Sequence, residues 1–73
     1  MSYLNFIPAG VSASGKTKLW GIQSLGGNVL GMVSWFAAWR KYTFSPEHGT
    51  IFDPSCLREI ADFVEAKTKE HKS

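Results

Sequence analysis

The sequence predicts an α+β domain, in which an antiparallel three- to four-stranded β-meander is followed by one C-terminal amphipathic helix packed on one face of the sheet. Residues 17–45 contain segments of alternating character separated by a glycine-rich turn, and residues 54–69 place apolar side chains at helical spacing. The length of 73 residues allows one small domain. Because a domain of this size buries little apolar surface, we expect it to form a homodimer or to fold onto a partner.

We expect residues 1–15 to form a flexible N-terminal arm and linker, and residues 16–73 to form the single domain of sheet and helix. The first residues carry an apolar cluster that ends at Pro8. Such a cluster suits either an added edge strand or an arm that docks on a partner. The following residues 9–15, AGVSASG, are small and flexible, as is typical of a linker.

Residues 10–17, GVSASGKT, match the phosphate-binding pattern G-x-x-x-x-G-K-[ST] letter for letter. That motif also requires a helix that starts at Lys16 and Thr17, because the amides at a helix start contact the phosphates. The residues that follow have strand and turn character, and the remaining chain is too short for the parallel sheet of such an enzyme. We therefore expect a linker here, and P-loop nucleotide binding is the third and least favoured hypothesis.

Two strands joined by a hairpin are expected next. Thr17 to Gln23 alternates between two faces, and Val29 to Phe36 is dense in β-branched and aromatic residues. Between them, residues 24–28, SLGGN, tolerate the positive φ angles of a tight turn. The nearly uncharged run 19–39 is long enough for a membrane helix, but its glycines and polar residues lead us to reject that interpretation.

The chain from Ala37 to Phe52 is expected to add two further strands. Ala37 and Ala38 are weak strand formers, so a turn or bulge is plausible there. A third strand is expected at residues 39–45, followed by a turn at residues 46–49 and a short fourth strand at residues 50–52.

The C-terminal helix is expected from Pro54 to about Lys69. Asp53 stands where an N-cap accepts hydrogen bonds from unpaired amides, and proline suits the first helical position. The helix should pack on the sheet through an apolar stripe. Its expected members are Leu57, Ile60, Ala61 and Val64, widened by Cys56 and Phe63.

The stretch WFAAWRKYTF at residues 35–44 is the strongest candidate for a binding surface, because half of its residues are aromatic and two are adjacent cations. If the helix covers the face that carries Tyr42 and Phe44, then Trp39 and Lys41 lie on the open face. The predicted binding surface comprises Trp35, Trp39, Arg40 and Lys41. The candidate phosphate contacts for a nucleic acid are Lys16, Lys18, Arg40 and Lys41. The register at residues 37–38 decides which side of the preceding strand joins the open face, either Met32, Ser34 and Phe36 or Val33 and Trp35.

Two functions suit such a surface. Aromatic rings beside an arginine favour a protein-interaction module, for example an inhibitor of a host factor, which binds a host or phage protein. The alternative partner is single-stranded nucleic acid, through base stacking and phosphate neutralisation. The net charge of +2 is too mild to indicate a strongly basic surface.

An enzymatic function is not expected. Cys56 belongs to the apolar stripe and is expected to be structural, and the scattered His48 and His71 give no metal-site spacing, so no catalytic residue, metal or cofactor is predicted. The helix carboxylates share its solvated side: Glu59, Asp62 and Glu65. A single cysteine and the lack of a signal peptide pattern predict a cytoplasmic protein without membrane contact, in the host cell if the protein is encoded by a phage.

Two segments, W-R-K-Y-T-F-S-P at residues 39–46 and T-I-F-D-P-S-C-L-R-E-I-A-D-F at residues 50–63, resemble a group of short phage- and prophage-encoded proteins without an assigned function. Those proteins share the pattern W-R-x-Y-x-F-x-P followed by F-x-x-x-C-L-x-x-I-A-x-F. The resemblance implies a viral or mobile-element origin.

The expected architecture is also similar to that of the PC4-like transcriptional coactivators, which are dimers that bind single-stranded DNA. Residues 45–57, S-P-E-H-G-T-I-F-D-P-S-C-L, resemble the passage of that family from its third strand through its fourth strand into the helix. The family's richer set of strand lysines and arginines is not matched here. Likeness of fold does not establish DNA binding.

Overall fold

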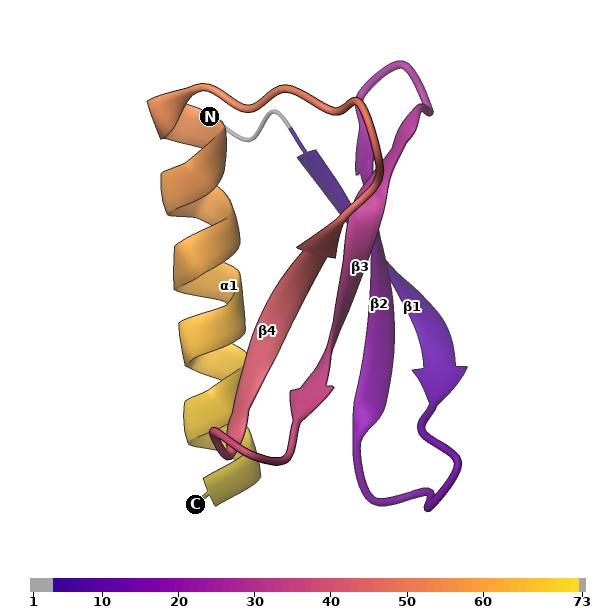
Figure 1. Cartoon of the computed structure of the whole chain (residues 1–73), viewed down its shortest axis with the longest axis vertical. Coiled ribbons are helices and arrows are strands. Elements are labelled where there is room, and N and C mark those ends of the chain that lie inside the picture. Colours follow the sequence, from indigo (N-terminus) through magenta and orange to yellow (C-terminus); the bar gives the residue numbers. More distant parts are fainter. Residues whose placement is uncertain (1–3, 73) are drawn as a thin grey trace.

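The computed structural model describes residues 4–72, and residues 1–3 and 73 lie outside the described part. Figure 1 shows a four-stranded antiparallel meander in the order β1-β2-β3-β4, followed by one helix that lies against the sheet. The elements are β1 (Leu4–Val11), β2 (Lys18–Ser24), β3 (Val29–Phe36), β4 (Lys41–Pro46) and α1 (Pro54–Lys72). The predicted fold class is confirmed.

Strand β1 lies within the segment for which we expected an arm and linker. It pairs with β2 so that Phe6 lies opposite Ile22 and Pro8 lies opposite Trp20. Proline is tolerated because β1 is an edge strand and its missing N–H removes no ladder bond from a central strand. Leu4 is buried in the core. The structure therefore differs from the expected boundary before residue 16, and of the two alternatives for the N-terminal cluster it shows the edge strand.

The hairpin between β2 and β3 forms where it was predicted. The Ser24 N–H donates to the Asn28 carbonyl at 2.9 Å, and Gly27 has a φ of 92°. Strand β3 has the predicted bounds. The uncharged run 19–39 thus supplies β2 and β3, and no helix of residues 4–72 is both long and apolar enough to cross a membrane.

The third predicted strand begins two residues later than expected, at Lys41. Phe36 pairs with Lys41, which leaves residues 37–40 as a four-residue turn. The Trp39 N–H donates to the Phe36 carbonyl at 3.1 Å, and Arg40 has a φ of 54°. The left-handed residue lets the chain turn back into the ladder, so Trp39 and Arg40 belong to the turn.

The predicted strand at residues 50–52 is wrong. This segment contains no strand and connects β4 to the start of α1. Ile51 is 92% exposed, whereas the half-buried Phe52 ring packs edge-to-face on Phe44 with 5.4 Å between centroids. The chain has to cross from the sheet to the helix here, so these apolar residues have no neighbouring strand to pair with.

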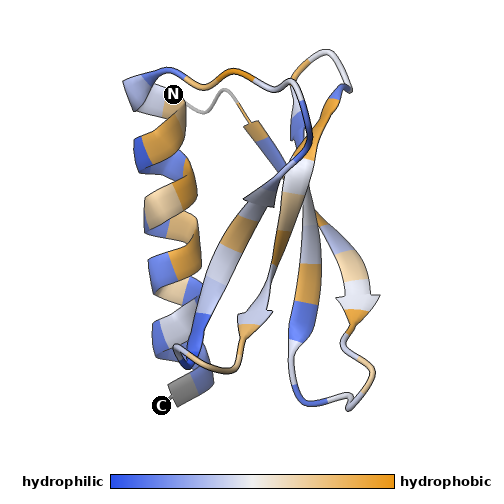
Figure 2. Cartoon of the chain, viewed as in Figure 1, coloured by the Kyte–Doolittle hydropathy of each residue, from blue (hydrophilic) through white to orange (hydrophobic). Residues whose placement is uncertain are grey.

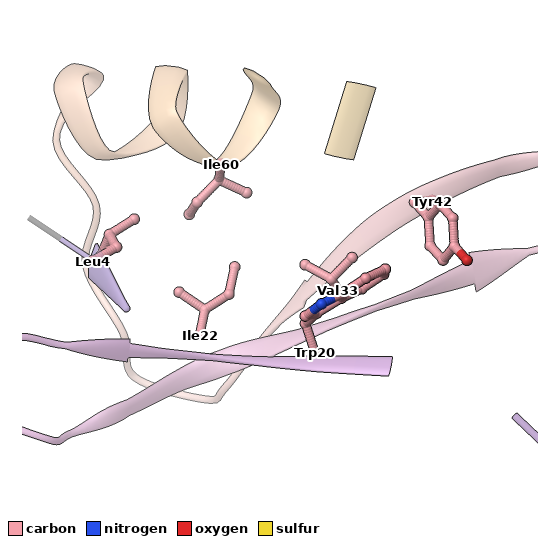
Figure 3. Packing of buried hydrophobic residues seen from close by; sticks show 6 residues of the cluster. All are labelled: Leu4, Trp20, Ile22, Val33, Tyr42 and Ile60. Atoms are coloured by element: carbon pink, nitrogen blue, oxygen red, sulfur yellow. The ribbon is translucent and has the colours of Figure 1, made fainter. Parts of the chain in front are cut away.

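The core lies between the sheet and α1. Figure 3 shows Ile60 pointing from the helix toward Leu4 and Ile22 on the sheet. Next to these buried residues, the half-buried rings of Phe6 and Phe63 stack with 4.2 Å between centroids. The buried residues are Leu4, Trp20, Ile22, Val33, Tyr42 and Ile60.

The start of α1 confirms the predicted cap. The Cys56 N–H donates to Asp53 Oδ1 at 2.8 Å. This hydrogen bond is the main reason why the pKa of Asp53 lies below its usual value, since it stabilises the carboxylate form. The helix then runs three residues beyond the predicted end at Lys69.

The buried side of α1 differs partly from the predicted stripe. The residues that pack against the core are Cys56, Ile60, Phe63 and Val64. Leu57 and Ala61, which were expected to be covered, are exposed. The helix is rotated so that Phe63 reaches Phe6 and Trp20 on the first two strands, which turns Leu57 and Ala61 outward.

Candidate functional site

Trp35 does not share the open sheet face with Trp39. It lies opposite Tyr42 in the ladder, and their rings pack edge-to-face with 5.2 Å between centroids. The imidazole of His71, near the end of α1, lies 4.4 Å from the Trp35 ring. The register at residues 37–38 therefore places Trp35 half-buried on the helix side, and the predicted binding surface is divided.

The remaining three residues of that surface gather with a fourth residue, Phe36. Trp39 is 65% exposed, and its ring packs T-shaped against Phe36, which is 44% exposed, with 4.7 Å between centroids. Lys41 lies opposite Phe36 in the ladder, so both side chains belong to the face that α1 leaves open. We call Phe36, Trp39, Arg40 and Lys41 the aromatic turn.

Most of the cations lie at one end of the molecule. Figure 1 shows that the β1–β2 loop, the β3–β4 turn and the C-terminal end of α1 lie together at the lower end, and Figure 2 shows hydrophilic residues at the lower ends of β2 and β4. We call this the basic end. Seven of the eight lysines and arginines belong to these segments or adjoin them: Lys16, Lys18, Arg40, Lys41, Lys67, Lys69 and Lys72.

The acidic residues are distributed differently. Four of the six carboxylates follow the end of β4 or lie in the first half of α1, namely Glu47, Asp53, Glu59 and Asp62. The two acids near the basic end are paired, Glu70 with Lys67 at 3.2 Å and Glu65 with Lys69 at 3.6 Å. The mild net charge therefore conceals a strong separation of charge along the molecule.

A depression of about 360 Å³ opens at the basic end, between the start of β2 and the last turns of α1. We call it the basic pocket, and its lining residues are Lys16, Lys18, Trp20, Tyr42, Lys67, Glu70 and His71. The Lys18 N–H donates to the Tyr42 hydroxyl oxygen at 3.1 Å, which ties the start of β2 to β4. Three ammonium groups face one carboxylate, so the lining carries a formal charge of +2 with His71 neutral.

A second hollow, of about 500 Å³, lies between β4 and α1. Its lining is mainly apolar and includes Ala61 and Val64, with Lys41 and Lys69 also at its wall. Two of its lining residues are hydrogen-bonded to each other, since the Tyr42 N–H donates to Thr68 Oγ1 at 3.0 Å. The helix thus satisfies an outward-facing amide of the edge strand β4.

The phosphate-binding sequence pattern forms a hairpin loop. The Ser12 N–H donates to the Thr17 carbonyl at 2.8 Å, and the Gly15 N–H donates to the Ser12 carbonyl at 2.9 Å. Strand β2 follows where a P-loop would need a helix. These loop amides are used within the hairpin, so the least favoured hypothesis has no structural support, although Lys16 lines the basic pocket.

Cys56 is half-buried against the core. Burial raises the pKa of its thiol above the usual value, and the hydrogen bond and negative charge of Asp53 act in the same direction. This environment disfavours the thiolate that a nucleophile or metal ligand requires. Within residues 4–72 no three His, Cys, Asp or Glu side chains are grouped closely enough to hold a metal ion.

The basic pocket could not be predicted from the sequence because its cations come from separate segments of the chain. Lys16 and Lys18 flank the start of β2, whereas Lys67 and His71 lie in the last turns of α1. Phe36 was visible as an aromatic residue next to the predicted turn, but its face depended on the register. The pairing of Phe36 with Lys41 in the structure places Phe36 on the open face of the sheet.

The chain is similar to a protein of Acholeplasma phage L2 named "Uncharacterized 9.3 kDa protein". The two are 33% identical over an alignment of 73 residues, which covers 96% of this chain and 90% of the relative. No family model matches the chain. No solved structure matches it.

Proposed function

The chain belongs to the same family of small phage proteins as the Acholeplasma phage L2 protein, and within that family we propose a non-enzymatic binding function, namely that the basic end binds single-stranded nucleic acid. One observation carries this proposal: the segments that carry Lys16, Lys18, Arg40, Lys41, Lys67 and Lys69 lie at the same end of the molecule as the turn that exposes the rings of Phe36 and Trp39. The sequence alone favoured a protein partner because aromatic rings beside an arginine suit a protein hot spot, and the mild net charge indicated no strongly basic surface. The separation of charge removes that objection.

The salt dependence of this function can be estimated from the cations. In the described part of the chain, four of those at the basic end take part in no ion pair, namely Lys16, Lys18, Arg40 and Lys41. If all four contact phosphates, the slope of log K against log salt for a single strand is about −2.8. Affinity then falls roughly fiftyfold between about 50 and 200 mM salt.

The exposed rings suit unpaired bases. A base stacked on Trp39 contributes about 1 to 3 kcal/mol, and every base offers a face for this contact. In the aromatic turn, two cations directly follow Trp39 in the sequence, Arg40 and then Lys41. We therefore expect binding with little sequence preference, and weaker binding to duplexes, whose bases are already stacked.

The test is a titration of labelled oligothymidylate, read by fluorescence anisotropy at two salt concentrations. Arg40→Gln should weaken binding and reduce the magnitude of the salt slope by about 0.7. The matched control is Arg58→Gln, which removes an exposed cation from the other end of α1 and should leave affinity and slope unchanged. Lack of binding at low salt, or equal effects of the two substitutions, would refute the proposal.

The second candidate function is binding of a host or phage protein through the aromatic turn, as an inhibitor of a host factor would do. The observation in its favour is Trp39, which is 65% exposed and adjacent to Arg40, since Trp and Arg dominate protein hot spots. In that case Trp39→Ala should abolish capture of the partner, whereas Lys16→Gln should not affect it. A protein hot spot also depends less on salt than phosphate contacts do.

A further inference from the structure

Lys67 is a cation held in place at the wall of the basic pocket. Its ammonium lies 5.4 Å from the Trp20 ring centroid and 5.5 Å from that of Phe63, and 3.2 Å from the Glu70 carboxylate. Its side chain is half-buried, with 29% exposure. Binding of a ligand to this ammonium costs little side-chain entropy, because these contacts already restrict the lysine side chain.

The Tyr42 hydroxyl adds a neutral donor to the pocket. Its oxygen accepts the Lys18 N–H, and a tyrosine hydroxyl also carries one hydrogen of its own. Tyr42 is fixed by its edge-to-face contacts with Trp20 and Trp35. A fixed hydroxyl donor beside ammonium groups is suited to the oxygens of an anion.

The charge of the lining indicates which anion fits. The pocket carries a formal charge of +2 from Lys16, Lys18 and Lys67 against Glu70. A phosphate monoester carries a charge of about −1.5 to −2 at pH 7, whereas an internal phosphodiester carries a single negative charge. A monoester therefore balances the pocket, and a diester leaves it positive.

We propose that the basic pocket binds a phosphate monoester, the terminal phosphate of a nucleic acid strand whose bases stack on the aromatic turn. This inference rests on the proposed function. The pocket volume of about 360 Å³ accommodates a phosphate with part of its sugar, and the pocket and the aromatic turn lie at the same end of the molecule. The protein accordingly prefers strand ends to the interior of a strand.

The test compares oligothymidylates of equal length that carry a 5′-phosphate, a 3′-phosphate or hydroxyls at both ends. The quantity measured is the ratio of affinities with and without the terminal phosphate, which should be about tenfold or more for at least one end. Lys16→Gln should lower this ratio, and Glu70→Gln should raise it because it removes the one carboxylate that residues 4–72 contribute to the lining. The opposite signs exclude a general loss of folding as the cause.

Trp39→Ala serves as the matched control outside the pocket, because it should weaken the binding of all three oligonucleotides and leave the ratio unchanged. A ratio near one with intact oligonucleotide binding would overturn the pocket inference and leave the proposed function standing. Sensitivity to Lys16→Gln without any preference for a phosphorylated end would assign the pocket to an internal diester and also overturn it.

Thymidine 5′-monophosphate separates the two proposals if no oligonucleotide binds. A shift of the Trp20 indole signal in NMR spectra, reduced by Lys16→Gln, would retain the pocket as a phosphate monoester site while the nucleic acid function failed. No shift and no oligonucleotide binding would overturn both proposals.

Discussion

Gly31 is the position where one methyl group should have the largest effect on stability. It lies in β3, and a Cβ built there would stand 2.6 and 2.7 Å from two ring carbons of Phe44 and closer still to the Ser45 carbonyl oxygen. The ring could rotate, but the carbonyl belongs to β4, which pairs with β3 along its length. Gly31→Ala therefore has to push the two strands apart.

The magnitude follows from these contacts. Overpacking of a well-packed site costs about 1 to 3 kcal/mol, and contact with a backbone atom places Gly31→Ala near about 3 kcal/mol. In a domain of this size each 1 kcal/mol lowers Tm by roughly 4 to 8 °C, so the expected loss is about 12 to 24 °C. Thermal and urea unfolding followed by circular dichroism would measure both quantities.

Gly21 provides the matched control. It is also a strand glycine with a negative φ, but its Cβ would meet the Met32 sulfur at 3.8 Å and the Ile7 carbonyl oxygen at 3.9 Å, which are ordinary contacts. Gly21→Ala should change stability by less than about 1 kcal/mol, with a gain expected from the stiffer unfolded chain. A Gly31→Ala variant as stable as Gly21→Ala would refute the close approach of β3 and β4.

Three further substitutions test the turn, the edge strand and the cap. Arg40→Gly relieves the left-handed φ of 54° and should raise the free energy of unfolding by up to about 1 kcal/mol while oligonucleotide affinity falls; a lower Tm would contradict the turn geometry. Thr68→Val removes the acceptor of the Tyr42 N–H and should cost about 1 to 3 kcal/mol in urea unfolding, whereas Thr68→Ser, which keeps the hydroxyl, should cost less. The pKa of Asp53 is lowered in the folded protein, so its carboxylate stabilises the fold above the ordinary value of 3.8, and this contribution disappears as pH falls through the lowered pKa. Asp53→Asn keeps a capping oxygen and should lose less stability than the wild type on acidification; identical pH profiles in thermal melts would speak against the cap.

Local signals were sufficient for several elements. The hairpin at residues 24–28 could be predicted because Gly27 supplies the positive φ that the turn needs. The start of α1 could be predicted because Asp53 and Pro54 have defined positions at a helix N-terminus. In both cases the physical cause lies within a few residues of the sequence position, so the neighbouring residues determine the outcome.

Strand β1 and the segment 50–52 show where local signals fail. Pro8 and the small residues after it conceal a strand whose apolar side chains, Leu4 and Phe6, become apparent only when β2 and α1 lie beside them. Conversely, the apolar letters of residues 50–52 form no strand, since no neighbouring strand is available to pair with them. Strand formation depends on a partner, and the partner is distant in the sequence.

The sequence by itself determined the α+β class, the central hairpin, the capped helix and the presence of an aromatic segment beside Arg40 and Lys41. The tertiary structure decided that Trp35 lies under α1, that Trp39 is exposed, and that Lys16 and Lys18 meet Lys67 at the basic end. The reason is physical: backbone preferences and capping act over a few residues, whereas burial and electrostatic potential depend on which segments fold next to each other.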